Sequence, residues 1–175
     1  MIFKISRVFY MVAACALGTM SVAQESTNRV GLNTDWSVFT EDDPKECWAV
    51  SAPKETVNTK DGQTVEVRRG EVLLIVFYRP AADVKAQLAF TGGYPFASNS
   101  TADMEIAGTT FQLYTEGEWA WPASPEDDAK IVAAMKRGAD TTLTAQSGRG
   151  TQTSDKFSLL GFTAAEEDAA LRCAG

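Results

Sequence analysis

Short segments rich in β-branched and aromatic residues recur along this chain from position 36 onward, at intervals of about ten residues. Turns such as Gly92-Gly93 and Gly148-Arg149-Gly150 separate them. The segments expected to form strands are Trp36–Phe39, Cys47–Ser51, Gln63–Arg69, Glu71–Tyr78, Ala86–Phe90, Asp103–Ile106, Thr110–Tyr114, Thr141–Ala145 and Lys156–Leu160. Many short strands with regular turn signals are typical of an antiparallel β-sandwich or a barrel-like domain, so we predict a mainly β fold.

The most apolar of these segments, Glu71–Tyr78, is bracketed by Gly70 and Pro80, which favours a central strand over a helix. The segment Gln63–Arg69 alternates apolar with charged residues, the pattern of a half-buried strand. Residues 24–34 are polar and are expected to form a loose lead into the first strand.

Two helices are expected to interrupt the strands. For the first, Ser124 is the expected N-cap and Pro125 the first helical residue. Gly138 follows two basic residues and can close this helix in the left-handed conformation.

The second helix is expected at the C-terminus. It begins at Thr163, and Glu166 completes a capping box. Small residues recur every four positions, which places Ala165, Ala169 and Cys173 on one face of the helix. We expect this face to press on the sheet.

The first 23 residues have the composition of a signal peptide. Lys4 and Arg7 form a positive n-region, and a short apolar stretch follows. Ser21-Val22-Ala23 supplies the small residues that a signal peptidase requires, so cleavage is expected after Ala23. A second interpretation is a bacterial lipobox, in which Cys15 is lipidated and becomes the first mature residue.

The remaining residues, 24–175, suit one hydrophobic core and contain no linker-like stretch, so we predict a single β-rich domain. No second long apolar run follows, and no membrane-spanning segment is expected in the mature chain. Loss of Lys4 and Arg7 leaves 14 of the 16 cationic residues against 23 acidic ones, a formal charge of −9. Such a surface repels phosphate backbones, so nucleic-acid binding is not expected.

Cleavage of the leader also removes Cys15, one of three cysteines. Cys47 and Cys173 remain, an even pair in a chain expected to reach an oxidising compartment. We predict that they form a disulfide that ties the last helix to the first strands. The alternative is two free buried thiols.

The chain contains no histidine, which excludes Ser-His-Asp and Cys-His catalysis and almost every zinc or copper site. It also lacks a P-loop, a dinucleotide fingerprint, a CxxC pair and an EF-hand loop, so we predict no cofactor and no metal. Catalysis by carboxylates is not excluded, because Glu116 and Glu118 lie beside two tryptophans in the sequence, as an acid pair of a glycosidase would. A solvated turn is the simpler interpretation.

Two segments are candidate ligand or partner surfaces. Trp119 and Trp121 share a face if the segment is extended, either as a stacking platform or, more simply, as core packing. The segment around Arg149, Gly150 and Gln152 either forms an array of backbone N–H groups for a carboxylate or phosphate, or a hairpin turn before a polar edge strand. Three further arginines either pair with the surplus acids or mark an anion site: Arg68, Arg69 and Arg79.

Several blocks along the chain carry a family resemblance. They are Asp35–Phe39, Pro44–Trp48, Tyr78-Arg79-Pro80, Gly92–Phe96, the segment from Arg149, Phe157–Ala165 and the terminal Arg172-Cys173. Over nearly the whole mature chain these blocks resemble the invasion-associated locus B family. The resemblance implies an exported, β-rich envelope protein of a Gram-negative bacterium, linked in pathogenic members to entry into host cells. The family has no established catalytic residues, so the resemblance implies none here.

We therefore expect a non-enzymatic protein of the periplasm or cell surface that binds an envelope protein or glycan. An alternative is a carboxylate-dependent enzyme that acts on an envelope polysaccharide. A third is a structural or stress-related envelope protein without a discrete site.

Overall fold

The computed structural model describes residues 28–174. These residues form one antiparallel sheet of 12 strands, a short 3₁₀ turn, η1 (Pro80–Ala82), and two α-helices, the second of them C-terminal. The predicted mainly β class with two helices is confirmed. The predicted signal peptide, its cleavage site and Cys15 lie outside the described residues.

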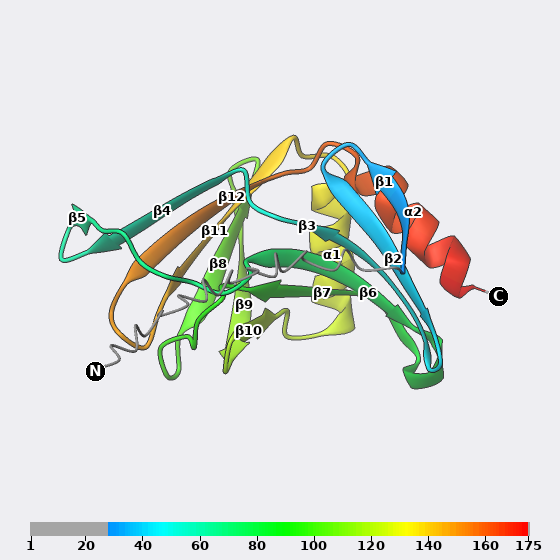
Figure 1. Cartoon of the computed structure of the whole chain (residues 1–175), viewed down its shortest axis with the longest axis horizontal. Coiled ribbons are helices and arrows are strands. Elements are labelled where there is room, and N and C mark those ends of the chain that lie inside the picture. Colours follow the sequence, from blue (N-terminus) through cyan, green and yellow to red (C-terminus); the bar gives the residue numbers. More distant parts are fainter. Residues whose placement is uncertain (1–27, 175) are drawn as a thin grey trace, which may run out of the picture.

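The sheet is open. Its strands are β1 (Arg29–Asn33), β2 (Trp36–Asp42), β3 (Lys45–Ser51), β4 (Glu55–Lys60), β5 (Gln63–Thr64), β6 (Leu73–Arg79), β7 (Val84–Thr91), β8 (Thr101–Ile106), β9 (Thr109–Glu116), β10 (Trp119–Trp121), β11 (Asp140–Gln146) and β12 (Gln152–Ser158). They lie side by side in the order β1-β2-β3-β6-β7-β10-β9-β8-β11-β12-β4-β5 (Figure 1). The edge strands β1 and β5 do not pair with each other, so the sheet does not close into a barrel.

We divide the sheet between β10 and β9. The first half holds β1, β2, β3, β6, β7 and β10, and the second half holds the other six strands. One face of both halves packs on a common core, which includes Val38, Leu88, Met104, Leu143 and Phe157. We call this the inner face of the sheet and the opposite one the outer face.

Helix α1 (Pro125–Met135) begins as predicted. Its N-cap Ser124 accepts a hydrogen bond at Oγ from the N–H of Asp127, at 3.2 Å, and Pro125 follows. The predicted left-handed Gly138 is wrong, because the helix ends at Lys136 in the right-handed region. Gly138 is instead required by packing: a Cβ there would lie 2.8 Å from Cγ2 of Ile106.

Helix α2 (Phe162–Cys173) presses its small-residue face on the sheet as predicted, with Ala165, Ala169 and Cys173 buried. The predicted capping box is wrong. The N-cap is Gly161, in the left-handed conformation at φ 89°, and no side chain caps the helix. Glu166 is held elsewhere, because its carboxylate accepts a hydrogen bond from the Tyr78 hydroxyl, at 2.7 Å.

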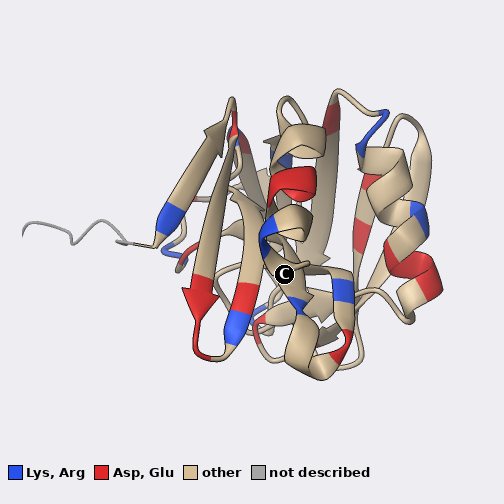
Figure 2. Ribbon diagram, turned by 90° about the vertical axis from the view of Figure 1, so that its right-hand side faces the viewer, with Lys and Arg blue, Asp and Glu red and all other residues tan. Residues whose placement is uncertain are grey.

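Acidic residues gather on the first turn of α1 and along α2 (Figure 2). Negative charge near a helix N-terminus is favoured by the helix dipole. In α1 these residues are Glu126, Asp127 and Asp128, of which only Asp128 is buried.

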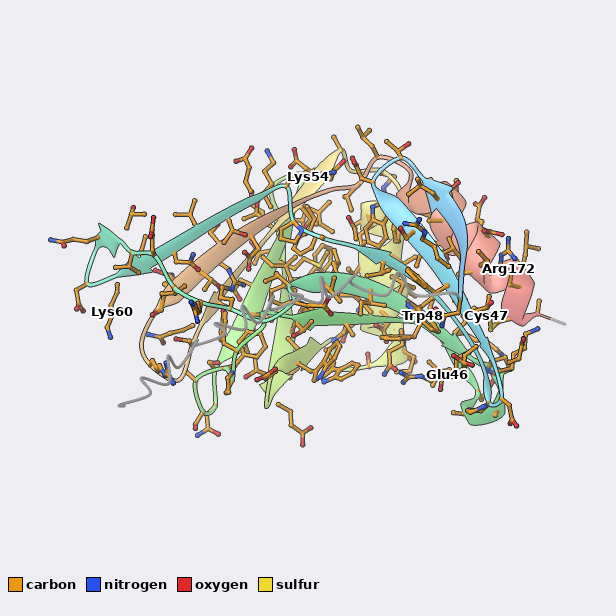
Figure 3. The ribbon with its side chains drawn as sticks, in the orientation of Figure 1. Glu46, Cys47, Trp48, Lys54, Lys60 and Arg172 are labelled. Carbon is orange, nitrogen blue, oxygen red and sulfur yellow. A yellow bond between two sulfur atoms is a disulfide. The ribbon has the colours of Figure 1, made fainter. Side chains whose placement is uncertain are left out.

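Cys47 and Cys173 form the predicted disulfide, with their Cα atoms 5.9 Å apart. Cys47 lies on β3, and Figure 3 shows it beside the helix that carries Arg172. The bond therefore joins the C-terminal helix to the first half of the sheet across 126 positions of sequence.

Three sequence predictions about strands are wrong. Residues 29–33, expected as part of a loose lead, form edge strand β1, and residues 55–60 form β4, which was not predicted. The predicted strand Gln63–Arg69 is a strand only at Gln63–Thr64. Its remainder leaves the sheet because Arg69 turns toward the core, where it meets a buried carboxylate.

Candidate functional site

A cleft of about 560 Å³ opens at one end of the inner face. Four segments that are far apart in sequence form it: the stretch before β6, the β7–β8 connection, the β9–β10 turn and the β11–β12 turn. The cleft is lined by Val67, Arg68, Arg69, Gly93, Tyr94, Pro95, Glu118, Ser147, Gly148, Arg149, Thr151 and Thr153. Such concave sites with a few polar groups are the usual places where proteins bind ligands.

A buried ion pair between Arg69 and Asp155 holds the cleft together. The guanidinium donates to both carboxylate oxygens of Asp155, at 2.8 and 2.5 Å, and Nε donates to the carbonyl of Gly92 at 2.8 Å. The Thr56 hydroxyl donates to the same carboxylate at 2.8 Å. Since the Asp155 side chain is fully buried, this bidentate pair is the main compensation for its lost hydration.

Tyr94 extends this polar network toward the cleft. Its ring lies 5.0 Å from the Arg69 guanidinium carbon, in cation–π geometry, and its hydroxyl is 2.6 Å from Oγ1 of Thr153. Burial raises the pKa of Tyr94 above its usual value. The Tyr94 hydroxyl is therefore a neutral, structurally committed group rather than a nucleophile.

Two arginines of the cleft, Arg68 and Arg149, are exposed and form no ion pair with any residue from 28 to 174. Of the arginines singled out from the sequence, Arg69 pairs with Asp155, and Arg79 pairs with Glu46 at 3.2 Å. In a chain with 23 acidic and 16 basic residues, unpaired cations at one cleft are notable. They leave two guanidinium groups available for an anionic ligand.

The turn that carries Arg149 is a hairpin turn, as the simpler interpretation predicted. Three of its N–H groups are already bonded: Gly148 donates to the Pro95 carbonyl at 3.0 Å, Gly150 to the Ser147 carbonyl at 2.9 Å, and Thr151 to Ser147 Oγ at 3.1 Å. These groups are therefore not free to hold an anion. The following strand, β12, is not an edge strand, because it pairs with both β11 and β4.

Gly150 and Gln152 do not line the cleft. They lie in a separate, smaller groove with Thr59, Asp61 and Gly62 at the far end of β4. Only Arg149 of the three residues predicted from this segment therefore belongs to the cleft.

Trp119 and Trp121 lie on the outer face of β10, so their predicted place in the core is wrong. Ala120 between them is fully buried in the core, and alternation turns the two indoles outward. Their rings stack with centroids 5.7 Å apart, and 36% of Trp119 is exposed. The structure thus separates the tryptophan pair from the cleft, because neither indole is among the residues that line it.

The two carboxylates considered for catalysis do not converge. Glu118 lines the cleft, whereas Glu116 is the cross-strand partner of Trp119 and shares its outer face. A glycosidase needs both carboxylates to face the same ligand site, where they flank the scissile bond at a separation of about 5–9.5 Å.

Sequence reasoning missed Asp155 and Tyr94. Asp155 occupies an inward position between the buried Thr153 and Phe157, and a charged residue at such a position requires a partner. An acidic residue at a buried strand position therefore predicts a buried ion pair, but the pattern does not identify which arginine is the partner.

Within residues 28–174, no group of three or more acidic or cysteine side chains is arranged to hold a metal ion. No helix in this part of the chain is both long and apolar enough to cross a bilayer. These features define a class of protein: an open, curled antiparallel sheet that is joined to its C-terminal helix by one disulfide and has an arginine-bearing cleft.

Comparison with known proteins places this class. Residues 36–170 match the sequence profile described as Invasion associated locus B (IalB) protein, and the chain belongs to this family. A crystal structure of invasion associated protein B from Bartonella henselae superimposes with a TM-score of 0.56, over 83% of this chain and 98% of that chain. Its sequence identity is 12%, so this likeness concerns the fold alone. Comparison with curated protein sequences gave no match.

Proposed function

We propose that this protein is an exported, non-enzymatic binding protein of the bacterial envelope, and that its cleft binds an anionic group of an envelope protein or glycan. The observation that carries the proposal is the pair of exposed arginines, Arg68 and Arg149, at a cleft built on a rigid buried ion pair. Membership of the invasion-associated family and the disulfide support an exported location.

The arrangement of the cleft favours binding over catalysis. Three of its hydroxyls are engaged within the fold: those of Tyr94 and Thr153 with each other, and that of Ser147 as an acceptor for the Thr151 N–H. Glu118 is the one carboxylate among the lining residues, while Glu116 faces away on the outer face. Exposed charged groups on a fixed scaffold, without an activated nucleophile, suit recognition of a charged ligand.

The first test is retention of the purified protein on isolated envelope fractions. We expect saturable binding that weakens as salt is raised, because the contacts are between exposed charges. Substitution of both arginines, Arg68→Ala with Arg149→Ala, should reduce retention at least about tenfold, the equivalent of losing roughly 1.4 kcal/mol of binding free energy.

Arg137→Ala is the matched control. Arg137 is also exposed and forms no ion pair within residues 28–174, but it follows α1 and does not line the cleft. This variant should bind like the unaltered protein. Equal losses in the control and the double variant would mean that net charge, not the cleft, governs retention. Undiminished binding by the double variant would refute the proposal.

Location is tested separately by protease accessibility in intact and in permeabilised cells. Digestion in intact cells would establish a surface position and support contact with host cells, as the family description suggests. Protection until the outer membrane is opened would establish a periplasmic position and direct the search to envelope partners.

A further inference from the structure

The outer face of the first half of the sheet is apolar across neighbouring strands. In Figure 1, α1 lies behind β6 and β7, so neither α1 nor the core covers the front of these strands. Outward-facing apolar side chains include Leu32, Phe39, Trp48, Phe77, Trp119 and Trp121. We call these six residues the apolar outer face.

Strand register makes this surface continuous. Phe39 on β2 is the direct partner of Trp48 on β3, and Trp48 is the direct partner of Phe77 on β6. The rings of Phe39 and Trp48 stack with their centroids 5.6 Å apart, and the centroids of Trp48 and Phe77 are 6.3 Å apart. Arg79 lies over the Phe77 ring at 4.4 Å, so the cation extends the aromatic row instead of interrupting it.

Both ends of this surface reach solvent. Leu32 on edge strand β1 is 66% exposed, and Trp119 on β10 is 36% exposed. A contiguous apolar surface of this kind is uncommon on a monomeric protein unless it binds a partner. It is also separate from the cleft, because it lies on the other face of the sheet.

The charged residues that border the apolar outer face indicate which charge its partner should carry. Three cations border it: Arg79 pairs with Glu46, Lys85 pairs with Asp83, and Arg29 on β1 lies opposite Phe39. Two bordering carboxylates, Glu71 just before β6 and Glu116 opposite Trp119, form no ion pair with residues 28–174. On the side of β6 and β10, the rim therefore carries uncompensated negative charge.

We propose that the apolar outer face is a docking surface for a cationic, apolar segment of another envelope protein. Apolar side chains of that segment pack on the aromatic row, and its lysines or arginines meet Glu71 and Glu116. A second copy of this chain fits poorly, since it would set like carboxylates against each other in a chain of net charge −7. Anionic lipid head groups are repelled for the same reason.

The probe for this surface is a synthetic peptide that alternates leucine and phenylalanine with lysine. Its counterpart carries glutamate in place of each lysine. Because Trp48, Trp119 and Trp121 belong to the surface, binding is followed by the intrinsic tryptophan fluorescence of the purified protein. We expect the cationic peptide to bind at least about tenfold more tightly than the acidic one at low salt.

Two leucines give matched variants. Leu32→Lys places a like charge on the docking surface and should weaken the cationic peptide at least about tenfold, because an exposed leucine anchor is lost and a repulsion is gained. Leu171→Lys makes the same change at a leucine of α2 that is 75% exposed and lies off this surface, and should alter affinity less than about twofold. Circular dichroism checks that both variants are folded.

Three outcomes would overturn the proposal. The first is equal affinity for the cationic and acidic peptides, and the second is equal loss in both leucine variants. The third is concentration-dependent dimerisation, or binding to uncharged phosphatidylcholine vesicles, that Leu32→Lys abolishes, which would assign the surface to a second copy or to a bilayer. None of these results depends on Arg68 or Arg149, so they test the docking surface independently of the proposal that the cleft binds an anionic group.

Discussion

The two halves of the sheet share one core but differ on their outer faces. In the second half, β8 alternates buried Ala102 and Met104 with exposed Asp103 and Glu105, the usual arrangement of a strand with one solvated side. In the first half, β6 is apolar on both faces, with Leu74 turned to the core and Phe77 turned outward.

The halves are also stabilised by different chemistry. The first half is tied to α2 by the disulfide between Cys47 and Cys173. The second half is tied to the chain before β6 by the buried pair of Arg69 and Asp155. The second half therefore has a solvated outer face, the first half has an apolar outer face on strands braced by the disulfide, and segments of both halves line the cleft.

Removal of the disulfide should have the largest effect on stability. Cys47→Ala with Cys173→Ala should lower the free energy of unfolding by about 5 kcal/mol, because the bond closes a very long loop in the unfolded chain. Urea unfolding followed by circular dichroism measures this change. Reductant added to the unaltered protein should reproduce the loss, and a change under about 1 kcal/mol would show that the brace on the first half is dispensable.

In the second half, Asp155→Leu should cost about 3–5 kcal/mol, because it leaves the Arg69 guanidinium buried without a counter-charge. The double variant Arg69→Met with Asp155→Leu should recover most of that loss in the same unfolding experiment.

The matched comparison in the first half is Glu46→Gln, which breaks the partly exposed pair with Arg79. It should cost less than about 1 kcal/mol, since exposed ion pairs contribute little. Similar losses at Asp155 and Glu46 would contradict the assignment of the buried pair as the main tie of the second half.

A smaller, pH-dependent effect is expected at Asp128 on α1. Burial raises the pKa of this carboxyl group from 3.8 to about 6, although the Leu88 N–H donates to it at 2.8 Å. The folded protein therefore holds the Asp128 proton more tightly than the unfolded chain does, and stability gained from this group grows as pH falls from about 7 toward 4.

The test is Asp128→Asn, whose amide oxygen can still accept from Leu88. The variant should lose this pH-dependent gain, on the order of 1 kcal/mol because part of the shift is screened by solvent. Unfolding in urea at pH 7 and pH 5, for both proteins, measures the difference. An identical change in the two proteins would exclude Asp128 as its source.

The smallest effect is expected at outward positions of the two halves. Leu32→Lys in the first half and Thr144→Lys in the second should each change the free energy of unfolding by less than about 0.5 kcal/mol. A large destabilisation by Leu32→Lys would mean that the apolar outer face serves folding rather than contact. Thermal unfolding monitored by circular dichroism is sufficient for this comparison.

The sequence predicted the strands whose pattern is local. Residues 103–106 and 141–145 alternate clearly, and the apolar run at residues 71–78 was recognised as a central strand. Strand β4 was missed because its sequence, ETVNTK, has only one apolar residue, and Thr56 uses its hydroxyl on Asp155 rather than burying an apolar group.

The cleft could not be predicted in full, because residues 67–69, 93–95, 118 and 147–153 meet only in the folded chain. Arg149 was singled out for its glycine neighbours, yet the feature that makes it a candidate for ligand binding is its guanidinium, which lines the cleft without an ion-pair partner among residues 28–174. Core packing was the simpler interpretation of the two tryptophans, whereas Ala120 between them is the residue that packs inward. Alternation alone does not say which of two faces is the buried one.

The most direct test of the contrast between the two outer faces is site-specific photo-crosslinking in bacteria that produce the protein. A photoreactive amino acid replaces Leu32 on the outer face of the first half or Thr144 on that of the second half. We predict a discrete adduct with another envelope protein from position 32, of a mass different from that of two copies of this chain, and no such adduct from position 144. The same adducts from both positions, or none from position 32, would contradict the account.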